Sequence, residues 1–267
     1  MRLRAIIITL SASLLMAGHA AAAPACGGDF SAWLADFKRE AATKSITSQA
    51  LAALDGITPD QSVISRDHNQ KVFQQSFEEF SGRMIPPRLQ RAENMMKRYG
   101  SLLVRIEQAY GVPGSVLVAI WGLETDFGSN IGTFPTLRSV TTLAFDCRRA
   151  DMFRAELLDA LRIIDRGDLA PGDMRGAWAG EMGQTQLMPS SYMKFAVDFD
   201  GNGKRDLLHS PADVLASTAN FLASKGWKRG QPWDPGQPNF DALKEWNKSE
   251  VYARTVAAFA DQLENEH

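Results

Sequence analysis

The segment VLVAIWGL, residues 116–123, constrains the fold more than any other part of the sequence. Its residues are apolar on every face of a helix, and a helix of that kind is buried on all sides. Gly122 interrupts the run at a cost of about 1 kcal/mol in helix propensity, so we expect it to permit close contact with a neighbouring element. The rest of the chain must therefore surround this one helix.

Apolar residues recur at helical spacing through most of the chain, whereas strand-like alternation is nearly absent. The predicted helical segments are 30–41, 89–110, 115–124, 153–165, 211–227 and 251–264. Glycine and proline predict loops at 83–88, 111–114, 166–176 and 229–239. We expect a mainly α globular protein, because 45% apolar residues are ample for a core.

The first 25 residues have the features of a secretory signal peptide, with two arginines, a short apolar stretch and small residues suited to signal peptidase. We expect cleavage near residues 20–25 and a soluble periplasmic product without a transmembrane segment. Lipidation is not expected, because His19 stands where a lipoprotein box has its acylated cysteine and Cys26 follows APA, a poor context for it.

Charge argues against nucleic acid as a partner. Without Arg2 and Arg4, the 29 basic residues become 27 against 31 acidic ones, a net charge of −4, and no basic tract occurs. The two cysteines, Cys26 and Cys147, are too distant for a CxxC motif and too few for structural zinc. In an oxidising compartment we expect a disulfide between them, with two separate thiols as the alternative.

Glu124 follows the apolar run and falls in the last turn of the predicted helix. Burial and the partial negative charge at the carbonyl end of a helix both raise the pKa of a carboxyl. A carboxyl that stays protonated near neutral pH is what a general acid requires. The sequence thus indicates a catalytic acid, with a buried salt bridge or a solvated position as the alternatives.

A second unusual stretch is WAGEMGQTQLMPSSYMKFAVDFDGNGKRD, residues 178–206. Its glycines allow backbone and ligand to approach closely, Gln184 and Gln186 offer amides, and Pro189 is typical of a helix start. The alternative is a buried loop whose glutamines satisfy backbone groups. No GxSxG, HExxH, Walker A or GxGxxG motif occurs in the chain.

The same stretch matches the first half of a calcium-binding loop. The residues at ligand positions 1, 3 and 5 are Asp198, Asp200 and Asn202. Gly203 occupies the sharp-turn position 6, but position 12 is His209 instead of a bidentate glutamate. Asp206 or Asp213 must then complete the site, and the calcium affinity would be modest. A turn without metal is the alternative.

Taken together, these stretches resemble the membrane-bound lytic transglycosylase B family, glycosidases of bacterial cell-wall peptidoglycan. The motifs occur in the family's order over most of the mature chain: YGVPGSVLVAIWGLETDFGSNIGTFPTLRSVTTLAF, CRRADMF, WAGEMGQTQLMPSSY, VDFDGNGKRDL and WNKS. The resemblance implies a lysozyme-like catalytic core flanked by a helical domain, with an EF-hand-like loop.

The resemblance also implies roles for individual residues, among which Glu124 matches the family's single catalytic acid. The positions that match its substrate-binding residues are Arg148, Arg149, Gln186, Phe221, Trp246, Asn247 and Tyr252. The positions that match its calcium site are Asp198, Asp200, Asn202, Lys204 and Asp213. Calcium would be structural, and the implied chemistry requires no cofactor.

The chain departs from the family pattern in two places. Ala177 replaces a serine that contacts sugar in some members, so that contact is lost. Only 18 residues, 228–245, stand where members carry a β-rich insertion, which puts contacts to distant glycan subsites in doubt. The expected organisation is a signal peptide over 1–25, a helical region over 26–105, a catalytic core with the calcium-type loop over 106–228, and a linker with a C-terminal helix packing back on the helical region over 229–267.

The implied activity is cleavage of the β-1,4 bond between N-acetylmuramic acid and N-acetylglucosamine, with 1,6-anhydromuramyl ends as product and Glu124 as acid and then base. Ordinary glycosidases need two carboxylates, and Glu181 could instead activate water and make the protein a hydrolysing muramidase. A non-catalytic peptidoglycan-binding protein is the third interpretation. The expected partners are glycan strands, and we expect a monomer.

Overall fold

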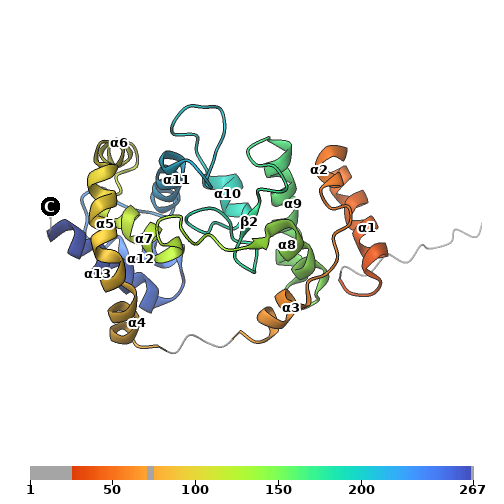
Figure 1. The fold of residues 1–267 in the computed structure, drawn as a ribbon, viewed down its shortest axis with the longest axis horizontal. Helices are drawn as coiled ribbons and strands as arrows, with labels where there is room; N and C mark the ends of the chain where they lie inside the picture. Colours follow the sequence, from red (N-terminus) through yellow and green to blue (C-terminus); the bar gives the residue numbers. More distant parts are fainter. Residues whose placement is uncertain (1–25, 71–74, 266–267) are drawn as a thin grey trace, which may run out of the picture.

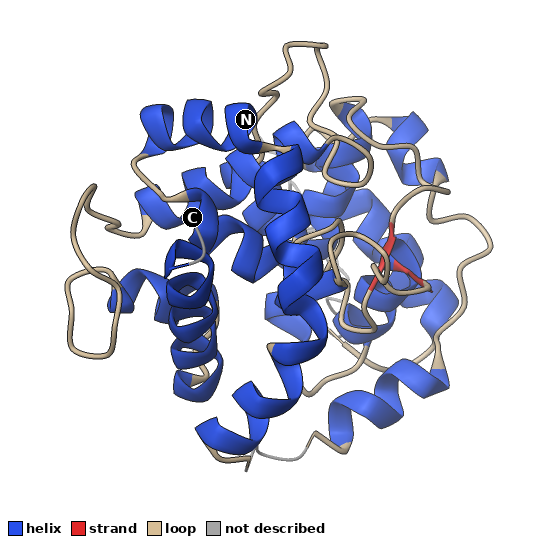
Figure 2. Cartoon of the chain, turned by 60° about the vertical axis from the view of Figure 1, so that its left-hand side comes forward, coloured by secondary structure: helices blue, strands red, loops and turns tan. Residues whose placement is uncertain are grey.

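The computed structural model describes residues 26–70 and 75–265, so the predicted signal peptide lies outside the described residues. The mainly α prediction is confirmed (Figure 2). The helices are α1 (Phe30–Thr43), α2 (Ser48–Ala52), α3 (Gln61–His68), α4 (Phe77–Met84), α5 (Pro86–Arg98), α6 (Gly100–Tyr110), α7 (Gly114–Thr125), α8 (Thr136–Phe145), α9 (Ala150–Asp165), α10 (Pro189–Phe195), α11 (Pro211–Ser224), α12 (Phe240–Trp246) and α13 (Glu250–Asn265). The short strands are β1 (Phe134–Pro135) and β2 (Arg175–Gly176).

Helix α7 is the central element that the sequence predicts. Every residue of α7 except Glu124 is buried, and α5, α6, α11 and α13 pack around it. A methyl group on Gly122 would lie 2.8 Å from the ring of Phe127, so the expected close contact is with the chain that turns back after the helix. Glycine at this position therefore allows the chain after α7 to fold against α7 itself.

Two local predictions need correction. The segment 89–110 is not one helix, because α5 ends at Arg98 and α6 begins at Gly100. The predicted loop 83–88 is mostly helical, with only Ile85 between α4 and α5. Pro86 opens α5, a position where proline is tolerated because the first N–H groups of a helix have no intrahelical acceptor.

The helices form two groups with the loop-rich middle of the chain between them (Figure 1). Helices α4 to α7, α12 and α13 lie on one side, and α1 to α3, α8 and α9 lie on the other. The C-terminal helix α13 packs on α7, α4 and α5. The helices of the predicted N-terminal region are therefore shared between the two groups.

A disulfide joins Cys26 to Cys147, with a Cα–Cα distance of 5.2 Å and a sequence separation of 121 residues. The Gly27 N–H donates a 2.8 Å hydrogen bond to the Phe145 carbonyl, and the Phe30 ring packs edge-on against the Phe145 ring. These contacts fix the start of the described chain to the connection between α8 and α9.

The connection over 228–245 carries no strand, and β1 and β2 are the only strands within the described ranges. Asn239 orders this connection, because its side chain accepts from the Lys228 N–H and donates to the Lys228 and Gln231 carbonyls. The expected lack of a β-rich insertion thus agrees with the fold.

Candidate active site

Glu124 is presented by the last turn of α7. The helix ends at Thr125, and the next residue, Asp126, caps it in the left-handed conformation with φ of 51°. Arg88 of α5 fixes this end, since its Nε donates to the Gly122 carbonyl at 3.0 Å and lies 2.7 Å from the Asp126 carboxylate. A cation beside the last carbonyls also offsets the negative end of the helix dipole. The position of Glu124 is therefore held by the helix end and not by a mobile loop.

Two donors from the C-terminal helices hold the Glu124 carboxyl. The Trp246 Nε1–H donates to Oε1 at 3.0 Å, and the Tyr252 hydroxyl donates to the same oxygen at 2.6 Å. No described residue forms a hydrogen bond with Oε2. Because Oε1 is occupied as an acceptor, Oε2 is the oxygen that can carry a transferable proton.

The environment favours the protonated form of this carboxyl. Burial raises the pKa of Glu124 above its usual value, and the negative charge of Glu181 raises it further, against the opposing hydrogen bonds from Tyr252 and Trp246. Burial also raises the pKa of the Tyr252 hydroxyl well above its usual range. The pair therefore consists of a neutral phenol and a carboxyl suited to donating a proton.

Glu124 opens into a cavity of about 450 Å³. The other lining residues are Ala177, Glu181, Gln186, Leu187, Met188, Ser191, Phe221, Glu245, Trp246 and Asn247. The Phe221 ring is buried and packs edge-on against the Trp246 ring at 5.0 Å, which supports the indole. Carboxyl, amide and hydroxyl groups thus converge on a cavity that also has aromatic and aliphatic side chains in its wall, a combination that suits a polar ligand with apolar faces.

The two glutamines of the cleft loop have different roles. Gln184 is buried and structural, because its amide joins Trp121 of α7 to the Leu208 carbonyl. Gln186 lines the cavity, and its Nε2 donates to the Ile131 and Gly183 carbonyls at 3.0 and 2.9 Å. Those bonds fix the amide and leave its oxygen free to accept from a ligand.

Arg148 and Arg149 do not line this cavity. Both pair with Asp67 of α3, a residue that is only 1% exposed; Arg148 Nη1 lies 2.9 Å from Asp67 Oδ2. Arg149 still acts on the cleft, because burial raises the pKa of Glu181 and the Arg149 charge opposes that rise. Contact of the two arginines with substrate stays a prediction.

The sequence does not single out Leu187, Met188, Ser191 or Glu245 as site residues. The first three belong to the LMPSS part of the cleft motif, so their place in that motif is the signal that could have found them. Asn247 follows the end of α12 and lines the cavity, where its side chain accepts from the Ser249 N–H at 2.9 Å. Ala177 also lines it and offers no hydroxyl group.

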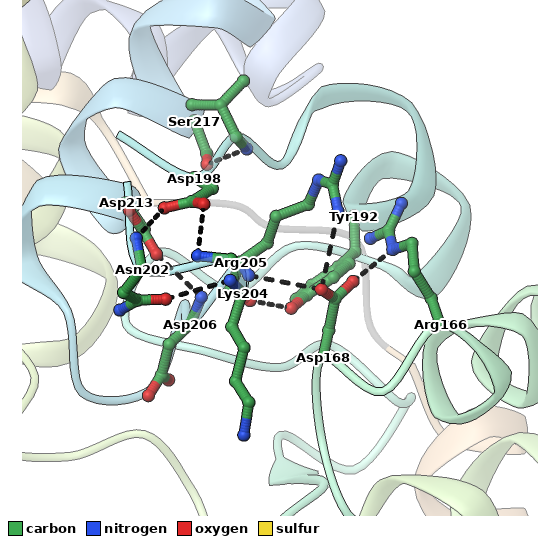
Figure 3. A network of polar contacts seen from close by, with 12 residues as sticks. Arg166, Asp168, Tyr192, Asp198, Asn202, Lys204, Arg205, Asp206, Asp213 and Ser217 are labelled. Carbon is green, nitrogen blue, oxygen red and sulfur yellow. Dashed lines mark hydrogen bonds and ion pairs between the residues drawn. The ribbon is translucent and has the colours of Figure 1, made fainter. Parts of the chain in front are cut away.

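The calcium-type loop lies between α10 and α11 (Figure 3). Carboxylate oxygens of Asp198, Asp200 and Asp213 all lie within 4.8 Å of one another. Asp198 accepts from the N–H groups of Gly201, Asn202 and Gly203 at 2.7 to 3.0 Å. Asn202 accepts from the Lys204 N–H at 2.9 Å. The loop thus brings oxygen atoms together in the way a calcium ion requires.

Asp213, and not position 12, completes the carboxylate cluster. It is buried in α11 and accepts from the Phe199 N–H at 2.8 Å and the Asp206 N–H at 2.9 Å. His209 is exposed and its Nδ1 faces Asp206. Oxygen donors of this kind suit calcium, so the residues present fit that ion.

A network of polar contacts ties the loop to the core (Figure 3). The Tyr192 hydroxyl of α10 donates to the Arg205 carbonyl, and the Arg205 N–H donates to Asp168 at 3.2 Å. Asp168 is also paired with Arg166. The loop therefore braces α10 and α11, and both helices carry cavity residues.

Comparison with known proteins places these features in a family. The family model described as Transglycosylase SLT domain matches residues 29–237. Membrane-bound lytic murein transglycosylase B of Escherichia coli (strain K12) is 36% identical over 164 residues, which make up 58% of this chain and 45% of that protein. The match therefore spans less than half the length of this curated relative.

Solved structures show the same architecture. SltB3 from Pseudomonas aeruginosa, in complex with NAG-anhNAM-pentapeptide, is 31% identical with a TM-score of 0.84; the match covers 89% of this chain and 80% of SltB3. The Escherichia coli lytic transglycosylase Slt35, in complex with calcium, is 26% identical with a TM-score of 0.79; the match covers 95% of this chain and 99% of Slt35. From its helical fold, its cleft glutamate and the extent of these matches, the chain belongs to the transglycosylase SLT domain family.

Proposed function

We propose that this protein is a lytic transglycosylase that cleaves the β-1,4 bond between N-acetylmuramic acid and N-acetylglucosamine in peptidoglycan. The observation that carries the proposal is the Glu124 carboxyl, held through one oxygen by Tyr252 and Trp246 while its pKa is raised at the wall of a cavity. The relatives support the substrate class, since SltB3 binds NAG-anhNAM-pentapeptide.

One carboxyl is enough for the proposed reaction. Glu124 gives its proton to the glycosidic oxygen as the bond to C1 of the muramyl residue breaks, and the muramyl acetamido carbonyl supports the cationic carbon. The resulting Glu124 carboxylate then takes the proton of the C6 hydroxyl as that oxygen bonds to C1. The product is a 1,6-anhydromuramyl end, water is not consumed, and Glu124 regains its proton.

Substrate contacts come from the residues that line the cavity. Gln186 offers an amide oxygen, Asn247 offers an amide, and the Trp246 indole offers an aromatic wall that Phe221 supports. Tyr252 is a positioning residue, because it acts through its hydrogen bond to Glu124. We place these functions in a catalytic core over 106–228, completed by α12 and α13.

The calcium-type loop has a structural role in this proposal. Asp198, Asp200 and Asp213 would supply carboxylates, Asn202 an amide oxygen and Lys204 its carbonyl. The hydrogen bonds of this loop connect it to α10 and α11, so bound calcium would stabilise the fold without entering the chemistry. A ligand at about 100-fold excess over its Kd stabilises the folded state by roughly 2.7 kcal/mol.

The proposal includes action in the periplasm as a monomer. Within the described residues no helix is long and apolar enough to cross a membrane. The disulfide between Cys26 and Cys147 is typical of proteins from an oxidising compartment.

Digestion of purified sacculi by the Glu124→Gln variant tests the proposed role of the acid. The amide keeps the shape of the side chain but cannot donate a proton as a carboxylic acid does, so we expect loss of lysis with retained binding to sacculi. Glu264→Gln, at the exposed end of α13, is the matched control and should lyse like wild type. More than a few per cent of residual activity in Glu124→Gln would show that the acid is misassigned.

A further inference from the structure

Glu181 is a second carboxylate of the cavity, and its backbone is fixed. The Ala177 N–H donates to the Glu181 carbonyl at 3.0 Å, and the next residue, Met182, exchanges hydrogen bonds of 2.9 and 3.0 Å with Leu187. Gly176 makes this possible, because any Cβ there would lie 1.7 Å from the Glu181 carbonyl oxygen. The side chain therefore leaves a rigid point of the loop toward the cavity that it shares with Glu124.

One of the two oxygens of the Glu181 carboxyl has no structural use that explains its position. Its Oε2 atom is buried and has no hydrogen-bond partner among the described residues. Buried carboxylate oxygens are normally hydrogen-bonded, so such an exception needs a reason. Arg149 supplies an opposing charge but is itself paired with Asp67, and within the described part of the chain its Nε is buried without a hydrogen-bond partner.

The charges around Glu181 come from α9 and from the cleft. Burial raises the pKa of Glu181. The backbone N–H groups of Glu181 and Ala179 and the Arg149 guanidinium at the start of α9 oppose that rise, and the Glu156 carboxylate adds to it. Glu156 itself is engaged, since it accepts from the Ser190 N–H at 2.8 Å and from its hydroxyl at 2.7 Å. Arg149 is thus the cation that favours an ionised Glu181.

The charged and titratable groups around Glu124 are few. Tyr252 comes from α13, Glu181 from the cleft loop and Glu245 from α12, while Arg88 of α5 is paired with Asp126. Glu245 is paired with Lys225 and Lys248, which neutralise its charge locally. Of the two other carboxylates that line the cavity, Glu181 is therefore the one whose charge is less neutralised by neighbouring cations, and its charge is the one that acts on Glu124.

We propose that Glu181 is a positioning residue of this site, whose negative charge keeps the proton on Glu124 until a glycosidic oxygen is bound. The inference rests on the proposed function and deepens it. Glu181 keeps its charge throughout the cycle: the proton passes from Glu124 to the leaving oxygen, and the C6 hydroxyl proton returns to Glu124.

The test compares Glu181→Gln, Glu181→Asp and Glu245→Gln. Two readouts are needed: the pH profile of lysis, and a carbon NMR titration of the glutamate carboxyls in which Glu124→Gln identifies the Glu124 signal. Removing a nearby anion stabilises the Glu124 carboxylate, so Glu181→Gln should move the basic limb and the Glu124 titration down by about one pH unit. Glu181→Asp retains the charge and should keep both close to their wild-type positions.

Glu245→Gln is the matched control, because it removes a carboxylate of the same cavity that two lysines already neutralise. It should leave the Glu124 titration in place. An unmoved Glu124 titration in folded Glu181→Gln, with normal anhydro products, overturns the inference. Failure of the proposed function would look different, because wild type would then release reducing ends whatever the NMR titration showed.

Discussion

Removal of the Cys26–Cys147 disulfide should strongly destabilise the protein while leaving its site intact. The perturbation is the double variant Cys26→Ser with Cys147→Ser. The bond joins residues 121 apart in sequence. In the chain-entropy model, closing such a loop lowers the entropy of the unfolded state and so raises its free energy by about 5 kcal/mol. At about 2–4 °C per kcal/mol for a domain of this size, the melting temperature should fall by roughly 10–20 °C.

Loss of the bond should change the free energy of the folded state much less than that of the unfolded state. The Gly27 hydrogen bond to Phe145 and the packing of Phe30 on Phe145 remain without the bond. These contacts hold α1 in place, and neither cysteine is among the residues that line the cavity. Lysis of sacculi at room temperature should therefore stay close to wild type.

Calorimetry of wild type and of the double variant, each with and without reductant, measures the effect. Cys147 is exposed, so reductant should lower the wild-type melting temperature toward that of the variant and leave the variant unchanged. Two free thiols per chain in wild-type protein purified without reductant, or equal melting temperatures for the two proteins, would refute the reasoning.

Three further predictions concern the acid and the metal loop. Tyr252→Phe removes a donor that stabilises the Glu124 carboxylate, so the basic limb of the pH profile should move upward and the rate should fall about tenfold; an unchanged profile would contradict the assigned bond. In urea unfolding, the stability of Glu124→Gln relative to wild type should be greater at pH 8 than at pH 4, and an equal difference at both pH values would argue against a raised pKa. The sign follows because burial raises the pKa of Glu124 in the folded state, so the wild-type protein loses stability as pH rises above the unfolded pKa of about 4.3. The loss in free energy of unfolding is about 1.4 kcal/mol for each pH unit that separates the folded from the unfolded pKa. Millimolar calcium should raise the melting temperature of the metal-free protein, Asp198→Ala should abolish that response, and chelation should leave the product unchanged; no rise in wild type would reduce the loop to an ordinary turn.

The sequence predicts the buried central helix α7 well and some of the surrounding helices less well. Burial of α7 follows from the apolar run alone, because no other environment suits a helix with that surface. Helix α8 is not predicted by apolar spacing, since its buried face includes Thr136, Ser139 and Thr141, residues that polarity assigns to the surface. Tertiary contact decides the position of such residues.

The candidate site, too, is only partly predictable from the sequence. The position of Glu124 at the end of a buried run signals an acid, but Trp246 and Tyr252 lie 122 and 128 residues away and become candidates only through the family resemblance. Spacing cannot show which distant side chains meet one carboxylate oxygen. The support of α10 by Glu156, 34 residues before Ser190, is likewise beyond the reach of sequence patterns.

The most direct test of the central claim is to digest purified sacculi with wild-type protein in water labelled with heavy oxygen and to analyse the released muropeptides by mass spectrometry. The proposed reaction uses the substrate's own C6 hydroxyl. We therefore predict 1,6-anhydromuramyl ends, one water lighter than reducing ends, with no heavy oxygen incorporated. Reducing ends that carry the heavy oxygen would show that water is the nucleophile and would contradict the account.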